Sequence, residues 1–319
     1  MNPTQKNRPI QISTPLGDDV LLFYRMSGYE SLNQLFEYEL ELLSTNDTIK
    51  PENLLGENVT ISLTLPEDKV RYFNGYVVRF GHYGRLGELT KYRAVVRPWL
   101  WFLSRSANCR IFQNKTTPEI IKQIVTDQGF SGEIKDQLKS SYKPRDYCVQ
   151  YRETDLNFVC RLMEEEGIFF YFDHENSKHQ LIMLDAVTDI KTFPNYAKIP
   201  FHQDSSGHND SSRIDHIYQW GFVKEVQPGG YALTDFDPTK SKTKLDAILN
   251  KPNSHKHAGY EIFDYPGYYQ DNSRGDSLVK IRLEELQARF ELCEGAGNAR
   301  GIAVGHKFTL TDYEIKEQN

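Results

Sequence analysis

The sequence predicts a mainly β protein with α+β insertions, and three observations support this fold class. Aromatic residues make up 13% of the 319 residues, and aromatic side chains pack well on a pleated sheet. Several runs alternate apolar and polar residues with the period of two that half-buried strands require. Other stretches instead carry apolar residues at helical spacing. At roughly 150 residues per domain, the length indicates about two domains.

Four runs in the first hundred residues indicate strands. Residues 36–42 alternate strictly between apolar and acidic side chains, and residues 59–65 alternate similarly before Pro66 ends the strand. Runs at 72–80 and 92–99 flank a glycine-containing loop, which predicts a hairpin in an antiparallel sheet or barrel. One face of the first strand should be core, and the acidic face carries Glu37, Glu39 and Glu41.

The pattern changes to helical spacing beyond residue 110. Thr117 is the expected cap of a short amphipathic helix with Pro118 in its first position and Gly129 at its end. A second helix is predicted to end at Gly167, because the apolar residues before it recur at i, i+3, i+4 and i+7. Residues 168–184 then predict a strand hairpin.

The last third of the chain predicts strands and one long helix. The polar residues 203–212 indicate a loop and a domain boundary, and the polar, basic residues 238–244 indicate a solvated linker. A helix is expected at 277–293, with Val279, Leu283, Leu286, Phe290 and Cys293 as its buried stripe. Further strands are expected at 214–223, 231–235, 300–304 and 307–312.

Composition argues against several classes of protein. With 38 basic and 44 acidic side chains the net charge is −6, and no block of like charges marks a nucleic-acid footprint. The four cysteines are far apart, so a disulfide framework or a structural zinc site is disfavoured. The polar start of the chain lacks a secretory signal, and the apolar runs are too short to span a bilayer. We therefore expect synthesis in the cytoplasm, with no cofactor and no stable membrane insertion.

Three consecutive acids, Glu164, Glu165 and Glu166, are the first candidates for chemistry. Paired carboxylates can act as acid and base, but neighbouring residues on a helix point in different directions. They also fall in the last turn, where the helix dipole disfavours negative charge. A salt bridge to an arginine, within the chain or at an interface, is therefore the favoured interpretation.

Other candidates are weaker. The histidines match no metal motif, and the glycines near residue 84 match no phosphate loop. Cys160 and Cys293 fall on predicted apolar helix faces, where thiols are usually part of the core. The tyrosine cluster at 265–269 has three interpretations, namely packing, an assembly interface or a sugar-binding platform.

Several longer strings together resemble the VgrG (valine-glycine repeat G) family, the spike proteins of the bacterial type VI secretion system. The resemblance covers nearly the whole chain in the same order, and the string at 151–172 is the most specific. The strings are RMSGYESLNQLFEYELELLS (25–44), WLWFLSRSANCRIFQNKTTPEIIKQI (99–124), YRETDLNFVCRLMEEEGIFFYF (151–172), DYPGYY (264–269) and ARGIAVGHKFTL (299–310).

The resemblance implies two similar β-barrel domains of phage tail hub type with an inserted α/β subdomain. It divides the chain into a first hub barrel (1–108), an inserted α+β subdomain (109–172), and the rest of the first barrel with the second barrel (173–319). It implies a homotrimer, in which six barrels match a hexameric, Hcp-like tail tube. The acidic strand face would then meet the channel lumen, a neighbouring subunit or solvent.

The resemblance also implies other partners and a route out of the cell. Family members carry a C-terminal needle, which binds a PAAR-type tip protein and effectors, and they contact baseplate proteins. Since the chain ends soon after the string KFTLTDYE, we expect a shortened second barrel. Contraction of the sheath would deliver the spike to the extracellular space or a target cell. The expected interface residues are Glu37, Glu39, Glu41, Arg152, Glu164, Glu165, Glu166, Tyr265, Tyr268 and Tyr269.

Two kinds of alternative stay open from the sequence. The first is a mechanical relative, the hub of a contractile phage tail or of an extracellular injection particle. The second is a different class of protein, either a cell-wall hydrolase that uses the acids at 164–166 or a carbohydrate-binding module that uses the tyrosines at 265–269. The resemblance favours a structural protein without catalytic residues.

Overall fold

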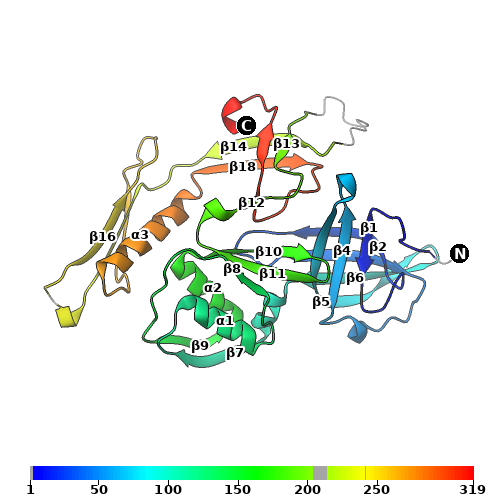
Figure 1. Ribbon diagram of the computed structural model, residues 1–319, viewed down its shortest axis with the longest axis horizontal. Coiled ribbons are helices and arrows are strands. Elements are labelled where there is room, and N and C mark those ends of the chain that lie inside the picture. Colours follow the sequence, from blue (N-terminus) through cyan, green and yellow to red (C-terminus); the bar gives the residue numbers. More distant parts are fainter. Residues whose placement is uncertain (1–2, 204–213, 241) are drawn as a thin grey trace. The chain divides into compact units, whose positions relative to one another are not determined.

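The structure is a computed structural model that describes residues 3–203, 214–240 and 242–319. The chain divides into two compact units (Figure 1). Unit 1 contains residues 1–164, 168–197 and 300–308, and unit 2 contains residues 165–167, 198–299 and 309–319. Both units are therefore assembled from segments that are distant in the sequence.

A six-stranded antiparallel sheet dominates unit 1, with the order β1-β4-β5-β6-β3-β2 (Figure 1). The predicted alternation in β3 is confirmed, because Phe36, Tyr38, Leu40 and Leu42 are all buried. The hairpin is also confirmed, but β5 runs straight through Gly81 and Gly84, and only Gly87 lies in its turn. The strands are β1 (Ile10–Ser13), β2 (Leu22–Tyr29), β3 (Glu37–Ser44), β4 (Asn58–Thr64), β5 (Val70–Leu86) and β6 (Leu89–Arg97).

The side chain of Gln5 joins the two edge strands of this sheet. Its carbonyl oxygen accepts hydrogen bonds from the backbone N–H groups of Ile12 in β1, at 3.0 Å, and Phe23 in β2, at 3.3 Å. Its amide also donates to the Ile12 carbonyl oxygen at 2.7 Å. A buried amide thus satisfies backbone groups that two edge strands would otherwise leave unpaired.

Two helices and two small sheets complete the core of unit 1. Helix α1 (Thr117–Asp127) begins one residue earlier than predicted, because Thr116 is its cap and forms a capping box with Glu119. Helix α2 (Asp155–Glu166) and the predicted hairpin are confirmed. The strands are β7 (Ala107–Phe112) with β9 (Cys148–Thr154), and β10 (Phe169–Glu175) with β11 (Lys178–Leu184) and β8 (Ile134–Asp136).

A segment from near the end of the chain returns to unit 1. Strand β19 (His306–Lys307) pairs in parallel with β12 (Lys191–Thr192), and Arg71 donates to the carbonyl oxygens of Arg300 and Ile302, each at 2.7 Å. The predicted strand at 300–304 is therefore wrong, because these residues lie outside any strand and are held by a side chain.

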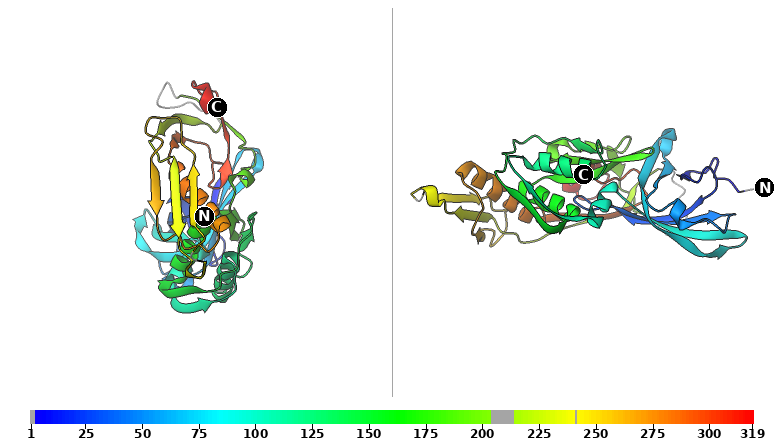
Figure 2. Two further views of the ribbon diagram at one scale, coloured as in Figure 1. Left: turned by 90° about the vertical axis from the view of Figure 1, so that its left-hand side faces the viewer. Right: turned by 90° about the horizontal axis from the view of Figure 1, so that it is seen from below.

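In unit 2 a helix packs on one face of a three-stranded sheet (Figure 2). Strand β15 (Gly230–Asp235) lies between β16 (Leu245–Asn250) and β17 (Glu261–Asp264), and α3 (Asn272–Gln287) packs on β15 and β16. A separate ribbon joins β14 (Ile217–Lys224) to β18 (Glu291–Gly297), and β13 (Lys198–Pro200) pairs in parallel with β20 (Thr309–Thr311). Short 3-10 turns lie at Pro51–Asn53, Pro66–Asp68, Trp99–Arg105, Val187–Asp189, Pro238–Lys240 and Lys316–Gln318.

The predicted helix at 277–293 has the wrong boundaries. Helix α3 begins five residues earlier, where the Asp271 side chain accepts the backbone N–H of Arg274 as a cap, and it ends at Gln287. Cys293 is exposed in β18 and does not belong to a buried stripe. The predicted loop at 203–212 lies almost wholly outside the described residues, and so does residue 241 of the predicted linker.

Candidate functional site

The three acids of β3 lie on the face of the unit 1 sheet that points away from the core. Glu41 accepts from Lys91 Nζ at 2.8 Å and from Arg93 at 2.9 Å, and Glu37 pairs with Arg97. These cations all lie on β6, the neighbouring strand, in the register that sets Glu41 opposite Arg93. The hydrogen bonds from Lys91 and Arg93 hold the pKa of Glu41 below its usual value.

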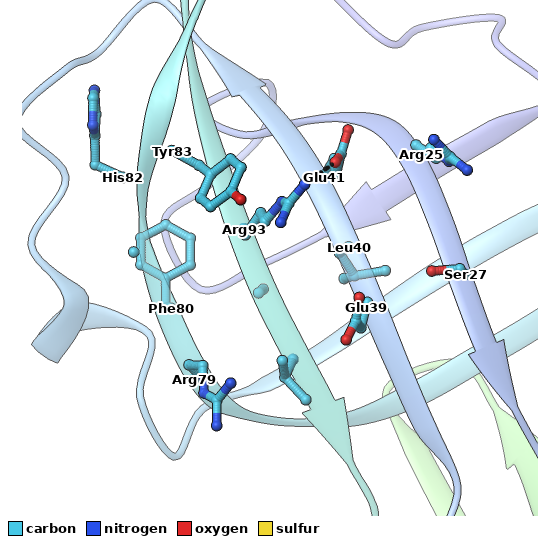
Figure 3. A pocket seen from close by; sticks show the side chains of 13 residues that line it. Arg25, Ser27, Glu39, Leu40, Glu41, Arg79, Phe80, His82, Tyr83 and Arg93 are labelled. Atoms are coloured by element: carbon cyan, nitrogen blue, oxygen red, sulfur yellow. Dashed lines mark hydrogen bonds and ion pairs between the residues drawn. The ribbon is translucent and has the colours of Figure 1, made fainter.

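Two hollows lie side by side on this face. The larger, about 540 Å³, is lined by residues of β2, β3, β5 and β6, among them Arg25, Glu39, Arg79 and Arg93 (Figure 3). The smaller, about 270 Å³, shares Glu39 and Arg79 with the larger and adds Arg105. Figure 3 shows Arg93 beside Glu41 and Tyr83, and its guanidinium lies 3.5 Å from the centre of the Tyr83 ring.

We call this surface the ladder face. The acidic face of β3 is only one part of this surface, because neighbouring strands bring more cations to the ladder face than β3 brings acids. Six cations stand against three carboxylates. The ladder face consists of Arg25, Ser27, Glu37, Glu39, Glu41, Arg79, Tyr83, Lys91, Arg93, Val95, Arg97 and Arg105.

The acids at the end of α2 pair with one arginine, as the helix dipole led us to expect. Arg274 approaches Glu166 at 2.7 Å and Glu165 at 3.7 Å, so the partner comes from the same chain and the same unit. Glu164 instead lies near Cys160. Burial, assisted by the charge of Glu164, raises the pKa of the Cys160 thiol to about 11, which makes this thiol a poor nucleophile.

The tyrosine cluster does not form one surface. Tyr269 is 4% exposed, and its hydroxyl donates to the carbonyl oxygens of Leu233 and Leu245. Burial raises the pKa of this phenol. Tyr265 and Tyr268 are exposed, at 58% and 85%. For Tyr269 the packing interpretation is therefore the right one.

Arg152 occupies a bulge in β9. Its φ of 52° lies in the left-handed region, and the register with β7 shifts beside it. Its guanidinium lies 5.2 Å from the centre of the Tyr151 ring, and Tyr151 is 64% exposed. The bulge thus presents a cation and an aromatic ring together at the surface.

A buried polar network in unit 1 was not predicted from the sequence. The side-chain oxygen of Asn74 lies 2.7 Å from Nδ1 of His179, and Nε2 of His179 accepts from the backbone N–H of Trp99 at 3.0 Å. The backbone N–H of Asn74 donates to Nδ1 of His174 at 3.1 Å, and Nε2 of His174 lies 3.2 Å from the Tyr38 hydroxyl. Each imidazole thus accepts a hydrogen bond at one ring nitrogen, which carries no proton, so both imidazoles are neutral.

Among the residues that the structure describes, no helix combines the length and the apolar character needed to cross a bilayer. The same residues bring no group of three or more His, Cys, Asp or Glu side chains together that could hold a metal ion.

The mainly β fold is similar to the folds of two solved proteins. A solved structure described as Escherichia coli c3393, a type VI secretion component similar to T4 tail proteins gp27 and gp5, matches with a TM-score of 0.70 and 18% identity, over 95% of this chain and 67% of that one. A 43 kDa tail protein of prophage MuSo2 from Shewanella oneidensis matches with a TM-score of 0.63 and 11% identity, over 97% and 90%.

The sequence profile of the phage tail baseplate hub (GPD) family matches residues 29–319, so the chain belongs to this family. It is 40% identical to the type VI secretion system spike protein VgrG1c of Pseudomonas aeruginosa, over 99% of this chain and 43% of that protein. It is 41% identical to VgrG1a of the same organism, over 99% and 48%. The chain therefore spans less than half the length of these relatives.

Proposed function

We propose that the chain is the hub of a type VI secretion spike. The observation that carries this proposal is the identity of 40% and 41% to two spike proteins over 99% of this chain. The spike hub would dock on a hexameric tail tube and leave the cell when the sheath contracts. Its role would be mechanical, with no catalytic residue.

The proposed assembly is a homotrimer with two barrels in each chain. The first barrel would include residues 1–108, residues 109–172 would be the inserted subdomain, and residues 173–319 would complete the first barrel and supply the second. Six quasi-equivalent barrels would then match a sixfold tube. Arg152, Tyr265 and Tyr268 are the exposed residues that we propose for subunit contacts.

Further partners are proposed by analogy with the family, namely baseplate proteins, a tip protein and effectors. A relative named actin cross-linking toxin VgrG1, from Vibrio cholerae, is 30% identical over 93% of this chain, but the match covers only 28% of that relative. We propose that the matched region serves as the hub and that toxin activity is no part of it.

The solution mass of the chain tests the proposal. Each chain weighs 37.1 kDa, so light scattering after size exclusion should give about three times that mass. The same sample should cap tail-tube hexamers in electron micrographs. A monomer that also fails to bind tubes would contradict the hub proposal. Secretion that persists without the sheath would favour the alternative of a phage tail or injection-particle hub.

A further inference from the structure

Three cations on the ladder face have no acidic partner in the described part of the chain. Arg25, Arg79 and Arg105 are all exposed, and no ion pair is formed by any of them with the described residues. The other cations of the face differ, because Lys91, Arg93 and Arg97 pair with acids of β3. The positive charge left over on the face therefore belongs to the three exposed arginines.

This surplus stands out against the rest of the molecule. The whole chain has a net charge of −6, while the ladder face has twice as many cations as carboxylates. Glu39 is the one acid of the face without an ion pair among the described residues, because it lies opposite Val95. The unpaired arginines would therefore attract an approaching anion, and Glu39 would be the main group to repel it.

The spacing of the arginines selects an extended occupant. Arg25 lies on β2 and Arg79 on β5, and the strands β3 and β6 separate them. Three strand spacings of about 4.8 Å place their backbones roughly 14 Å apart. An extended polypeptide crosses that distance in about four or five residues, so it can present one carboxylate to each arginine.

The interleaved acids favour a polypeptide over a nucleic acid. Glu37, Glu39 and Glu41 form a line along β3, between Arg25 of β2 and the cations of β6. A continuous phosphate backbone would meet these carboxylates, whereas a peptide can place acidic and neutral residues to suit them. The face also offers Val95 and the Tyr83 ring for apolar contact.

We propose that the ladder face docks an extended acidic segment of a partner protein, with Arg25 and Arg79 binding carboxylates at the two sides of the larger hollow. Arg105 extends the site into the smaller hollow. The proposal goes beyond the mechanical hub role. It concerns one unit of one chain, so it does not depend on the trimer.

Binding of a fluorescein-labelled ten-residue glutamate peptide to the full chain, followed by anisotropy in low salt, tests this proposal. Arg25→Gln and Arg79→Gln should each weaken binding roughly two- to fivefold, as expected for exposed ion pairs. The double variant should lose about tenfold. Lys69→Gln, which removes an exposed lysine elsewhere in unit 1, is the matched control and should bind like the wild type.

A variant of opposite sign sharpens the test. Glu39→Gln removes the unpaired acid, so it should tighten binding of the glutamate peptide about twofold. Circular dichroism should show that every variant keeps the native fold. Binding should also fall steeply as sodium chloride rises.

Four results would overturn the proposal. The first is equal binding by the arginine variants and the Lys69→Gln control, and the second is equally tight binding of a lysine peptide. The third is tighter binding of single-stranded DNA, which would assign the face to nucleic acid. The fourth is a wild-type protein that binds no peptide, together with a double variant of lower solution mass. The face would then bind a second copy of this chain and not a partner protein. If the double variant loses peptide binding but keeps the mass of the trimer, the docking proposal is supported and the hub proposal is unaffected.

Discussion

The buried histidines of unit 1 should make the protein labile in mild acid. Burial, with a smaller contribution from the charge of Arg71, lowers the pKa of His174 from 6.5 to about 4, although Glu30 and the hydrogen bond with Asn74 oppose the shift. Burial, assisted by the charge of His174, also holds the pKa of His179 well below its usual value. Both imidazoles are therefore neutral in the folded state and take up protons on unfolding.

The size of the effect follows from the shift. A histidine with a lower pKa in the folded state contributes stability above its unfolded pKa, which is lost as the pH falls toward the folded value. For His174 this window runs from 6.5 down to about 4. At 1.36 kcal/mol per pKa unit, His174 alone costs about 2 kcal/mol between pH 7 and pH 5. His179 adds a loss in the same direction.

Urea denaturation at pH 5, 6 and 7 measures this dependence. The free energy of unfolding should fall by about 2 kcal/mol or more over that range. In His174→Gln the side chain is uncharged throughout, so the dependence should shrink by about that amount even if the variant is less stable overall. His82→Gln replaces an exposed histidine in the same unit and serves as the control. The reasoning is refuted if the urea midpoint of the wild type stays constant from pH 7 to pH 5. It is also refuted if the free energy of unfolding of His174→Gln depends on pH as strongly as that of the wild type.

Three further substitutions test buried or nearly buried polar contacts within the units. Asp155→Asn should destabilise unit 1 by about 3 kcal/mol in urea denaturation, because the buried carboxylate pairs with Arg110. Tyr269→Phe should cost about 1 to 2 kcal/mol and speed hydrogen exchange in unit 2, since two backbone carbonyls lose their donor. Arg274→Ala leaves the nearly buried Glu166 carboxylate without its close ion pair, and should lower the melting temperature more than Arg274→Lys does.

Local patterns in the sequence predicted the helices and the strands with clear alternation, because each of these patterns depends on residues close together in the chain. The alternation in β3 shows this well, since its four apolar side chains are all buried. The end of α3 shows the limit. Phe290 and Cys293 continue the helical spacing by coincidence, but the chain has already left the helix and Cys293 belongs to β18. The spacing of apolar residues alone does not reveal where a helix ends and a strand that pairs with distant residues begins.

The candidate site was harder to predict because its chemistry comes from residues far apart in the sequence. Glu41 and Arg93 are 52 positions apart, and Glu166 and Arg274 are 108 positions apart. The helix dipole indicated that the acids of α2 needed a cation, but nothing local indicated which one. The network of Asn74, His174 and His179 has no local signal either, since its members are 100 and 105 positions apart.

The ladder face shows why the charge of a sheet surface cannot be inferred from one strand. Each strand contributes every second residue to a face, so β3 presents Glu37, Glu39 and Glu41 there but none of the cations. The two strands beside it present four cations, Arg25 on β2 and Lys91, Arg93 and Arg97 on β6, and the three on β6 pair directly with Glu37 and Glu41. Arg25 and Arg79 form no ion pair with the acids of β3, so positive charge exceeds negative charge on the ladder face. Glu37 and Glu41 are thus counter-charges within the surface, and Arg25 and Arg79 are the groups left for the proposed partner to bind.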